Sequence, residues 1–364
     1  MLKMKNGEVE NHKKTMWKIE YVHGAFPLVG IELEKANIRQ FLLWHTETQA
    51  YLAGEFPFST IYQLKTILKA YQVEQDDRFT PRYIANHKSR LGNLVSWLQE
   101  MWGEEFYQEF HSFSIQCAGK DSPEVRSIIT YIEEVTKLVY DDLDPDLKCY
   151  IIKIEDTWEI GVQIAARPVS MRDYRVEHMP GALNTSIAYG MNLLADVGQA
   201  DSYCNPCSGS GTLALEAALA NPHLSSVQGF DLDTEALTLA MHNITQAGLQ
   251  SRIHLSHRDL CDIPDLGCYD VIASDLPFGM GVAKYADLDF LYRSFFWFAR
   301  KNLAPQGRLV VITSQSDVFC QAMSETGFGI EAEITLRSMT SANDYLETYI
   351  YLCRLDYTYD INKY

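Results

Sequence analysis

The sequence contains no uncharged apolar run of the length that crosses a membrane, which takes about 18 residues or more. Residues 1–18 carry scattered lysines but lack the apolar segment of a secretory signal. Eight cysteines are spread over 364 residues, and without a secretory signal we expect reduced thiols rather than a disulfide framework. These absences predict a cytoplasmic protein that does not associate with membranes. We expect it to be a monomer or a homodimer.

Pairs of metal ligands are also scarce. Cys204 and Cys207 form one C-x-x-C pair, but no second pair at metal-site spacing accompanies it. The pair lies where a predicted strand meets a glycine-rich turn, which is a poor setting for a zinc or redox site. We therefore expect no metal.

Basic residues are in the minority, since 31 Lys and Arg stand against 48 Asp and Glu and give a formal net charge of -17. Binding to nucleic-acid phosphates requires Lys and Arg, so an acidic chain must concentrate such contacts. Residues 1–180 carry 21 basic and 27 acidic groups, and residues 181–364 carry 10 and 21. The first half is the better place for an RNA to bind, above all residues 78–99, which contain no acid. A solvated helix face is the alternative explanation of that stretch.

From about residue 181 onward, short apolar runs alternate with longer helical segments, which is typical of an α/β fold with a parallel sheet. Two further apolar stretches near the C-terminus flank a polar turn and predict a closing β-hairpin. We predict strands at 202–204, 226–230, 253–256, 271–273 and 308–313, helices at 212–220, 234–247 and 288–302, and the hairpin at 329–337 and 345–354.

The first half carries weaker patterns. A strand at 113–116, a helix at 123–139 and a hairpin at 149–154 and 158–165 predict a small α/β domain ending near residue 167. Before it, we expect a strand at 17–22 and a helix at 59–71. The expected units are therefore an N-terminal α/β region over 1–100, a second domain over 101–175 and a Rossmann-like domain over 176–364.

A glycine-rich turn follows the first predicted strand of the last unit, Asn205-Pro206-Cys207-Ser208-Gly209-Ser210-Gly211-Thr212. Glycines without Cβ atoms let a ligand approach the backbone N–H groups closely. No Lys precedes Thr212, which argues against a phosphate-binding P-loop, and Ala214 makes the dinucleotide G-x-G-x-x-G spacing a poor match. Alone, this turn is a weak signal.

Acidic residues follow the next two strands. Asp231 is followed by the apolar Leu232, and Asp259 by Leu260. At the carboxyl edge of a doubly wound sheet, an acid after the second strand can bind both ribose hydroxyls while its apolar neighbour covers an adenine. Asp259 is placed to accept from the adenine amino group, and Asp233 is predicted to cap the helix at 234. Each Asp alone is better explained as a turn residue, but the ordered series favours a nucleoside site.

The segment Asp275-Leu276-Pro277-Phe278-Gly279 follows the fourth strand, at the edge where ligands of α/β proteins bind. The amine of a nucleobase attacks a methyl group poorly while its lone pair is delocalised into the ring. A carboxylate and a backbone carbonyl that accept its two hydrogens would direct the lone pair outward, and an aromatic ring would stack on the base. Asp275, the Leu276 carbonyl and Phe278 can supply these groups, and Pro277 fixes the turn. A plain Asp-x-Pro turn is the alternative.

These segments resemble class I S-adenosylmethionine-dependent methyltransferases, and more narrowly the THUMP-domain guanine-N2 RNA methyltransferases. Residues 205–212 are similar to the family's D-P-x-C-G-S-G-T loop, and residues 275–279 look like its D-L-P-F-G segment. Asp144-Pro145-Asp146 and the hairpin at 149–165 resemble the end of a THUMP domain. Residues 172–175 are similar to the linker, and 180–184 to the helix that covers the methionine end of the cofactor. Two positions depart from the family pattern, because Asn205 replaces an acid and Ser208 replaces a cysteine.

The resemblance implies an α/β fold in which a class I methyltransferase Rossmann-like sheet with a C-terminal β-hairpin follows a THUMP-containing α+β region. It implies S-adenosyl-L-methionine as the cofactor and a THUMP-like RNA-binding domain over 101–175. The implied catalytic residues are Asp275, Leu276, Pro277 and Phe278. Those implied to hold the cofactor are Asn184, Asn205, Cys207, Gly209, Gly211, Thr212, Asp231, Leu232, Asp259 and Leu260. Candidate RNA contacts are Arg82, Lys88, Arg90, Arg167, Arg172 and Arg175, which solvation or pairing with nearby acids would explain equally well.

The expected function is methyl transfer to the exocyclic N2 amine of a guanosine in tRNA. One alternative keeps the chemistry and changes the acceptor to a guanine N2 amine in ribosomal RNA or to an adenine N6 amine, since an Asp-Leu-Pro-Phe segment suits either planar amine. Another alternative is a homologue that binds a structured RNA but has weak or no catalysis, which the acidic surface and Asn205 would allow.

Overall fold

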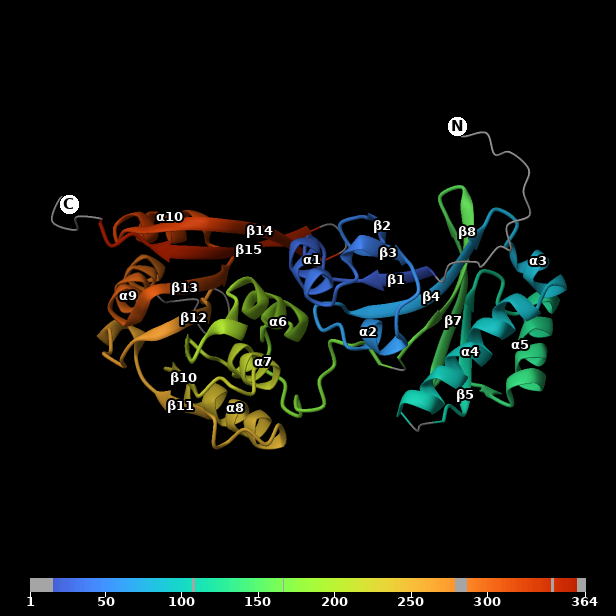
Figure 1. Ribbon diagram of the computed structural model, residues 1–364, viewed down its shortest axis with the longest axis horizontal. Helices are drawn as coiled ribbons and strands as arrows, with labels where there is room; N and C mark the ends of the chain where they lie inside the picture. Colours follow the sequence, from blue (N-terminus) through green and yellow to red (C-terminus); the bar gives the residue numbers. More distant parts are fainter. Residues whose placement is uncertain (1–15, 107–108, 166, 279–286, 342–343, 359–364) are drawn as a thin grey trace.

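The computed structural model describes residues 16–106, 109–165, 167–278, 287–341 and 344–358. Two β-sheets organise these residues, and Figure 1 shows them in two halves along the long axis of the molecule. The first half of the chain builds an eight-stranded sheet, and the second half builds a seven-stranded sheet. Within the described helices, none is both long and apolar enough for a membrane span.

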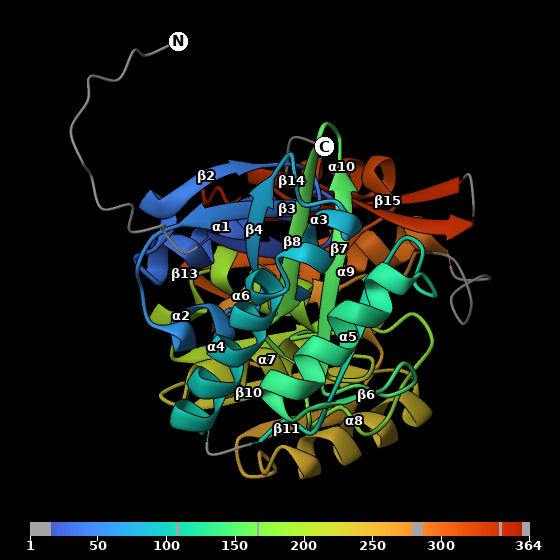
Figure 2. The ribbon, with the colours of Figure 1, turned by 90° about the vertical axis from the view of Figure 1, so that its right-hand side faces the viewer.

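The eight-stranded sheet has the order β2-β3-β1-β4-β8-β7-β5-β6. Its helices α3, α4 and α5 lie together on one face, as the view in Figure 2 shows. The elements are β1 (Met16–Glu20), α1 (Phe26–Lys35), β2 (Leu42–His45), β3 (Gln49–Ala53), α2 (Phe58–Tyr62), β4 (Lys69–Asp76), α3 (Pro81–Asn86), α4 (Ser89–Phe106), β5 (Ser112–Cys117), α5 (Pro123–Thr136), β6 (Val139–Tyr140), β7 (Leu147–Ile154) and β8 (Thr157–Gln163).

The helix predicted over 59–71 is wrong. Helix α2 ends at Tyr62, and β4 begins at Lys69 with β1 and β8 paired on its two sides. Two buried residues of β4 face opposite ways: Ala70 joins the main core while Tyr71 packs in a separate cluster on the other face. Pairing on both edges of the strand overrides a local helical spacing, because sheet formation depends on neighbouring strands.

The boundary expected at residue 100 does not coincide with a break in the structure. It falls inside α4, and β4 from the first segment pairs with β8 from the second, between Tyr71–Asp76 and Trp158–Gln163. Residues 1–100 and 101–175 therefore contribute to one continuous sheet as far as the chain is described.

The seven-stranded sheet has the order β11-β10-β9-β12-β13-β15-β14. Strands β9 to β13 run parallel. The hairpin β14-β15 extends the sheet at the β13 edge, where β15 pairs antiparallel with β13. This confirms the predicted Rossmann-like sheet and its closing hairpin. The elements are α6 (Thr185–Leu194), β9 (Ser202–Pro206), α7 (Thr212–Ala220), β10 (Ser226–Asp231), α8 (Thr234–Gln246), β11 (Ile253–His257), η3 (Leu260–Asp262), β12 (Tyr269–Asp275), α9 (Leu288–Asn302), β13 (Leu303–Thr313), α10 (Ser316–Ser324), β14 (Phe328–Ser341) and β15 (Asp344–Leu355).

Local sequence explains why these elements end where they do. Val271, Ile272 and Ala273 are buried in β12, as an apolar run covered on both faces of a parallel sheet should be. Asp233 caps α8 by accepting from the N–H groups of Glu235 and Ala236, which confirms that prediction. The strand order then brings the loops after β9, β10 and β12 to one edge of the sheet.

The two halves are packed against each other by α1 and α6 and by the far end of the hairpin. A Cβ added at Gly190 on α6 would lie 2.8 Å from Leu28 Cδ1 on α1. The Arg337 N–H of β14 donates to the His23 carbonyl at 3.2 Å, and a Cβ at Gly24 would lie 2.1 Å from the Thr335 oxygen. The two halves therefore lie in close contact at α1–α6 and at the hairpin.

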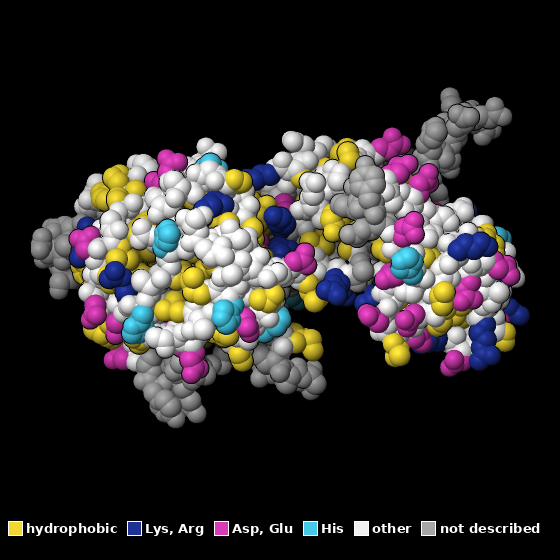
Figure 3. Space-filling model, turned by 90° about the horizontal axis from the view of Figure 1, so that it is seen from below, with side chains coloured by type: hydrophobic (Ala, Val, Ile, Leu, Met, Phe, Trp, Pro, Cys, Tyr) yellow, Lys and Arg dark blue, Asp and Glu magenta, His cyan; other side chains and the backbone are white. Residues whose placement is uncertain are grey.

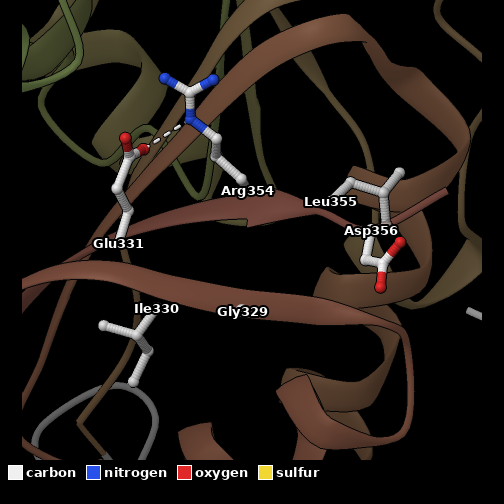
Figure 4. Close-up of a pocket in the computed structure, with 6 residues that line it drawn as sticks. All are labelled: Gly329, Ile330, Glu331, Arg354, Leu355 and Asp356. Carbon is white, nitrogen blue, oxygen red and sulfur yellow. Dashed lines mark hydrogen bonds and ion pairs between the residues drawn. The ribbon is translucent and has the colours of Figure 1, made fainter. Parts of the chain in front are cut away.

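A shallow hollow lies on the hairpin, lined by Gly329, Ile330, Glu331, Arg354, Leu355 and Asp356 (Figure 4). Figure 4 shows Arg354 turned toward Glu331, and the Arg354 Nε donates to the Glu331 carboxylate at 2.6 Å. Leu355 pairs with Phe328 at the end of the hairpin where β13 begins, whereas Thr313 at the end of β13 pairs with Tyr349. This hollow thus lies at the amino edge of the sheet, opposite the loops after β9, β10 and β12.

Candidate active site

Three of the residues predicted for a single site stand at the ends of adjacent strands. Asn205 lies near the end of β9, Asp231 ends β10 and Asp275 ends β12, and β9 lies between the other two. Burial raises the pKa of the Cys207 thiol well above its usual range, and the carboxylates of Asp231 and Asp275 raise it further. The structure therefore brings these acids together around Cys207.

The glycine loop, residues 205–211, is held by the acid of the neighbouring strand. Gly209 and Gly211 have φ values of 49° and 74°, which favour glycine. The Asp231 carboxylate accepts from the Gly209 N–H at 2.7 Å and from the Asp233 N–H at 2.9 Å. Each oxygen keeps a further lone pair, so Asp231 can fix the loop and still accept from two hydroxyl groups.

The loop also contains buried polar atoms without partners. Asn205 Oδ1 and Ser208 Oγ are buried and have no hydrogen-bond partner among the described residues. The other side-chain atom of Asn205, Nδ2, donates to the Ala273 carbonyl of β12 at 2.9 Å, and Ser274 Oγ donates to the Pro206 carbonyl at 2.8 Å. The amide at position 205 thus ties the glycine loop to β12 with a hydrogen bond that a carboxylate could not donate.

The residues expected around a nucleoside differ in their exposure and in the hydrogen bonds that they already make. The Leu232 side chain is 60% exposed, whereas Leu260 is buried and leaves only its backbone available. Asp259 accepts from the Cys261 N–H at 2.8 Å through one oxygen, and its carboxylate also raises the pKa of the Cys261 thiol after burial. Asn184 caps α6 by accepting from the Ser186 N–H at 2.9 Å, and Thr212 begins α7.

These features fit S-adenosylmethionine. The loop offers two unpartnered buried oxygens, Asp231 offers open acceptor positions for a ribose, and Leu232 presents an apolar surface that suits the face of a base. The described residues contain no group of His, Cys, Asp or Glu side chains arranged to hold a metal ion.

The reactive loop, residues 275–278, presents an unusual carboxylate. Burial raises the pKa of Asp275 to about 7, and no hydrogen bond from the described residues offsets that effect. The Leu276 N–H donates to the Ile312 carbonyl at 3.1 Å, and its side chain is buried. Gly279, the last residue of the predicted segment, lies outside the described residues.

Sequence reasoning missed the residues that hold this loop. Tyr292 on α9 donates to the Pro277 carbonyl at 3.0 Å, and Gln315 Nε2 donates to the Phe278 carbonyl at 3.0 Å. The run Thr313-Ser314-Gln315 was the available signal, because polar residues after a buried strand stand at the same edge as the other loops.

Among the predicted RNA contacts, Arg172 has a different role. Its side chain is 12% exposed and forms a two-point pair with Glu216, from Nε at 3.0 Å and from Nη2 at 3.3 Å. Nη2 also donates to the Lys65 carbonyl at 3.1 Å. Tyr174 donates to the same carboxylate at 2.6 Å. Arg172 therefore links the first half of the chain to α7, and its charge is paired inside the protein instead of facing an RNA.

The remaining predicted contacts are spread over the first half and the linker. Arg82 and Arg167 are exposed, and Arg175 is half-buried. Arg90 pairs with Glu74 at 3.2 Å, and Lys88 lies 5.9 Å from the Tyr131 ring centre. Seen from below, Lys and Arg side chains gather where the two halves meet (Figure 3).

Comparison with known proteins finds similarity over the second half of the chain. Residues 172–342 match the model of the RMKL-like methyltransferase domain. A tRNA (guanine(6)-N2)-methyltransferase of Archaeoglobus fulgidus is 27% identical over 208 residues, 50% of this chain and 53% of that protein. One of the same name from Thermus thermophilus is 32% identical over 165 residues, 45% of this chain and 49% of that protein. The matches thus span about half the length of these curated relatives.

The whole architecture resembles a solved structure. The crystal structure of TrmN from Thermus thermophilus superposes with a TM-score of 0.73 at 20% identity, and the match covers 94% of this chain and 100% of that one. The likeness extends through both sheets, so it includes the first half, which the family model does not reach.

Proposed function

We propose, on the premise that residues 172–342 belong to the RMKL-like methyltransferase domain family, that the protein methylates the exocyclic N2 amine of a guanosine in tRNA with S-adenosylmethionine. The single observation that supports this most is the reactive loop. Asp275 and the Leu276 carbonyl stand at the edge of the sheet beside the glycine loop, and neither receives a hydrogen bond from a described residue.

The bound cofactor supplies an electrophilic methyl group, and the chain supplies the orientation of the amine. Asp275 accepts one hydrogen of the NH2 group and the Leu276 carbonyl accepts the other, which turns the nitrogen lone pair out of conjugation. Phe278, half-buried beside them, provides an aromatic face against which the base stacks. The two acceptors match the two hydrogens of a primary amine.

Asp275 also receives the proton that the amine loses. Its pKa of about 7 suits a general base near neutral pH, because about half of the molecules carry the carboxylate and the acid form holds the transferred proton. The absence of a described hydrogen-bond donor to Asp275 keeps its lone pairs free for the amine. Methyl transfer should therefore depend on the carboxylate and not only on the shape of the loop.

Docking of the RNA is assigned to the first half and the linker. Arg82, Lys88, Arg90, Arg167 and Arg175 are the candidate phosphate contacts, since the second half has the larger excess of acids. The protein is expected to act as a monomer or a homodimer in the cytoplasm. If these residues contact phosphates, binding of tRNA to the protein weakens as the salt concentration rises.

Transfer of tritium from labelled S-adenosylmethionine to an unmodified tRNA pool tests this function. We expect incorporation by the wild-type protein and a loss of about 100-fold or more in the Asp275→Ala variant, the range in which a general base contributes. Asp265→Ala is the matched control, because Asp265 is exposed in the same half and pairs with Lys301 at 3.6 Å. Equal rates for Asp275→Ala and Asp265→Ala would refute the mechanism.

A further inference from the structure

A directed series of hydrogen bonds reaches the reactive loop from the end of β13. Thr313 Oγ1 accepts from the Gln315 N–H at 2.9 Å and lies 2.6 Å from the Tyr292 hydroxyl oxygen. The Tyr292 hydroxyl in turn lies 3.0 Å from the Pro277 carbonyl. A backbone N–H can only donate and a carbonyl can only accept. The proton order is therefore fixed: Gln315 donates to Thr313, Thr313 to Tyr292, and Tyr292 to Pro277.

Two more bonds secure the neighbours of Pro277. Gln315 Nε2 donates to the Phe278 carbonyl at 3.0 Å. Gln315 therefore makes two of these bonds, one to Thr313 through its backbone N–H and one to Phe278 through its side chain. The Leu276 N–H donates to the Ile312 carbonyl of β13 at 3.1 Å. All three residues after Asp275 are thus attached to the end of one strand or to the helix beside it.

The carbonyl of Leu276 is the exception. Of the carbonyls at 276, 277 and 278, it alone has no donor within the described part of the chain, and the Asp275 carboxylate likewise has none. Unbonded carbonyls at Pro277 and Phe278 would be additional acceptors close to the same amine. Occupying them leaves two open acceptor groups, the Asp275 carboxylate and the Leu276 carbonyl, one for each hydrogen of an NH2 group.

We propose that Tyr292, Thr313 and Gln315 are positioning residues that occupy the competing carbonyls and hold the Asp275 carboxylate and the Leu276 carbonyl toward a single NH2 group. This inference rests on the proposed function and deepens it, because it assigns the recognition of a primary amine to residues outside the reactive loop. None of the three touches the reacting atoms.

Two of the three residues of this network are buried side chains. Tyr292 and Thr313 are fully buried, and burial raises the pKa of Tyr292, so its hydroxyl stays a donor across the neutral range. Tyr351 is a matched control within the same apolar cluster. It is equally buried, but its hydroxyl contacts Ser316 Oγ at 2.8 Å and does not reach the loop.

Steady-state kinetics of Tyr292→Phe, Thr313→Val, Thr313→Ser and Tyr351→Phe, each in the full-length protein, measure the consequence. Tyr292→Phe and Thr313→Val should lower kcat for tRNA methylation about tenfold, with the KM for S-adenosylmethionine within about twofold of wild type. Thr313→Ser keeps the hydroxyl and should retain wild-type kcat, as should Tyr351→Phe. Equal kcat values for Tyr292→Phe and Tyr351→Phe would overturn the proposal.

Amide hydrogen exchange of the peptide containing residues 275–278 is a second readout that needs no turnover. Loss of the Tyr292 bond should raise its exchange rate about tenfold, while Tyr351→Phe leaves it unchanged. If the wild-type protein methylates no RNA but this exchange rises, the proposed function fails and the loop network stands. If the exchange rate is unchanged in both Tyr292→Phe and Gln315→Met, these residues do not hold the loop and the proposed network is wrong.

Discussion

Replacing Asp275 with Asn should stabilise the folded protein above neutral pH while it lowers methyl transfer. Burial raises the pKa of Asp275 from 3.8 to about 7, so the folded state binds the proton more tightly than the unfolded chain does. Between about pH 4 and pH 7, the folded state therefore holds more protons, and the free energy of unfolding falls as the pH rises. Above about pH 7 the loss contributed by this group is complete.

The size of the effect follows from the two pKa values. Each pKa unit corresponds to about 1.36 kcal/mol, so burial of the charged carboxylate costs at most about 4 kcal/mol. Asp275 is half-buried as a whole residue, and solvent screening reduces the expected gain to about 1 to 3 kcal/mol. Gains of this kind are common where catalysis requires a destabilised group.

Denaturant unfolding of wild type and Asp275→Asn at a series of pH values measures this gain. We expect the difference to grow from pH 5 to pH 7 and then to level off, whereas Asp265→Asn, on an exposed loop, should show no such trend. In parallel, wild-type kcat/KM should rise about tenfold from pH 6 to pH 8, following ionisation of Asp275, and the Asn variant should show a flat profile. A pH-independent difference in stability, or an Asn variant less stable than wild type at pH 8, would refute the reasoning.

Substitutions at Asn205, Gly211 and Arg172 each change one contact that shapes the site or its support. Asn205→Asp should destabilise the fold by about 1 to 3 kcal/mol in thermal melts, because a carboxylate cannot donate to the Ala273 carbonyl; Asn221→Asp, a half-buried control, should cost less. Gly211→Ala should weaken S-adenosylmethionine binding in calorimetric titration, whereas Gly248→Ala, with a similar positive φ in open space, should affect only stability. Arg172→Ala should cost about 3 to 5 kcal/mol of unfolding free energy, because it removes the cation that pairs with the buried Glu216 carboxylate. Arg82→Ala, by contrast, should leave the melting curve unchanged and weaken tRNA binding in a low-salt filter assay.

Much of the second half could be predicted from sequence because its signals are local. Buried parallel strands are continuous apolar runs, the cap at Asp233 is a short-range pattern, and the loops after β9, β10 and β12 follow their strands directly. Knowledge of a parallel order then suffices to place Asp231 and Asp275 at one edge. The same reasoning found the closing hairpin.

The features that sequence reasoning missed depend on contacts between distant residues. Arg172 is a basic residue in a linker, and only the fold reveals Glu216, 44 positions later, against its guanidinium. Tyr292 looks like one aromatic residue among several on α9, and its bond to the Pro277 carbonyl depends on how that helix packs beside β12 and β13. Residues 69–71, the start of β4, were predicted as the end of a helix because the partners of this strand, β1 and β8, lie far away along the chain.

Nucleoside analysis of tRNA after incubation with the protein and S-adenosylmethionine tests the central claim most directly. Unmodified tRNA is treated with wild type or Asp275→Ala, digested to nucleosides and examined by mass spectrometry. The account predicts N2-methylguanosine with wild type only. N6-methyladenosine in its place, or the same amount of N2-methylguanosine from both proteins, would contradict it.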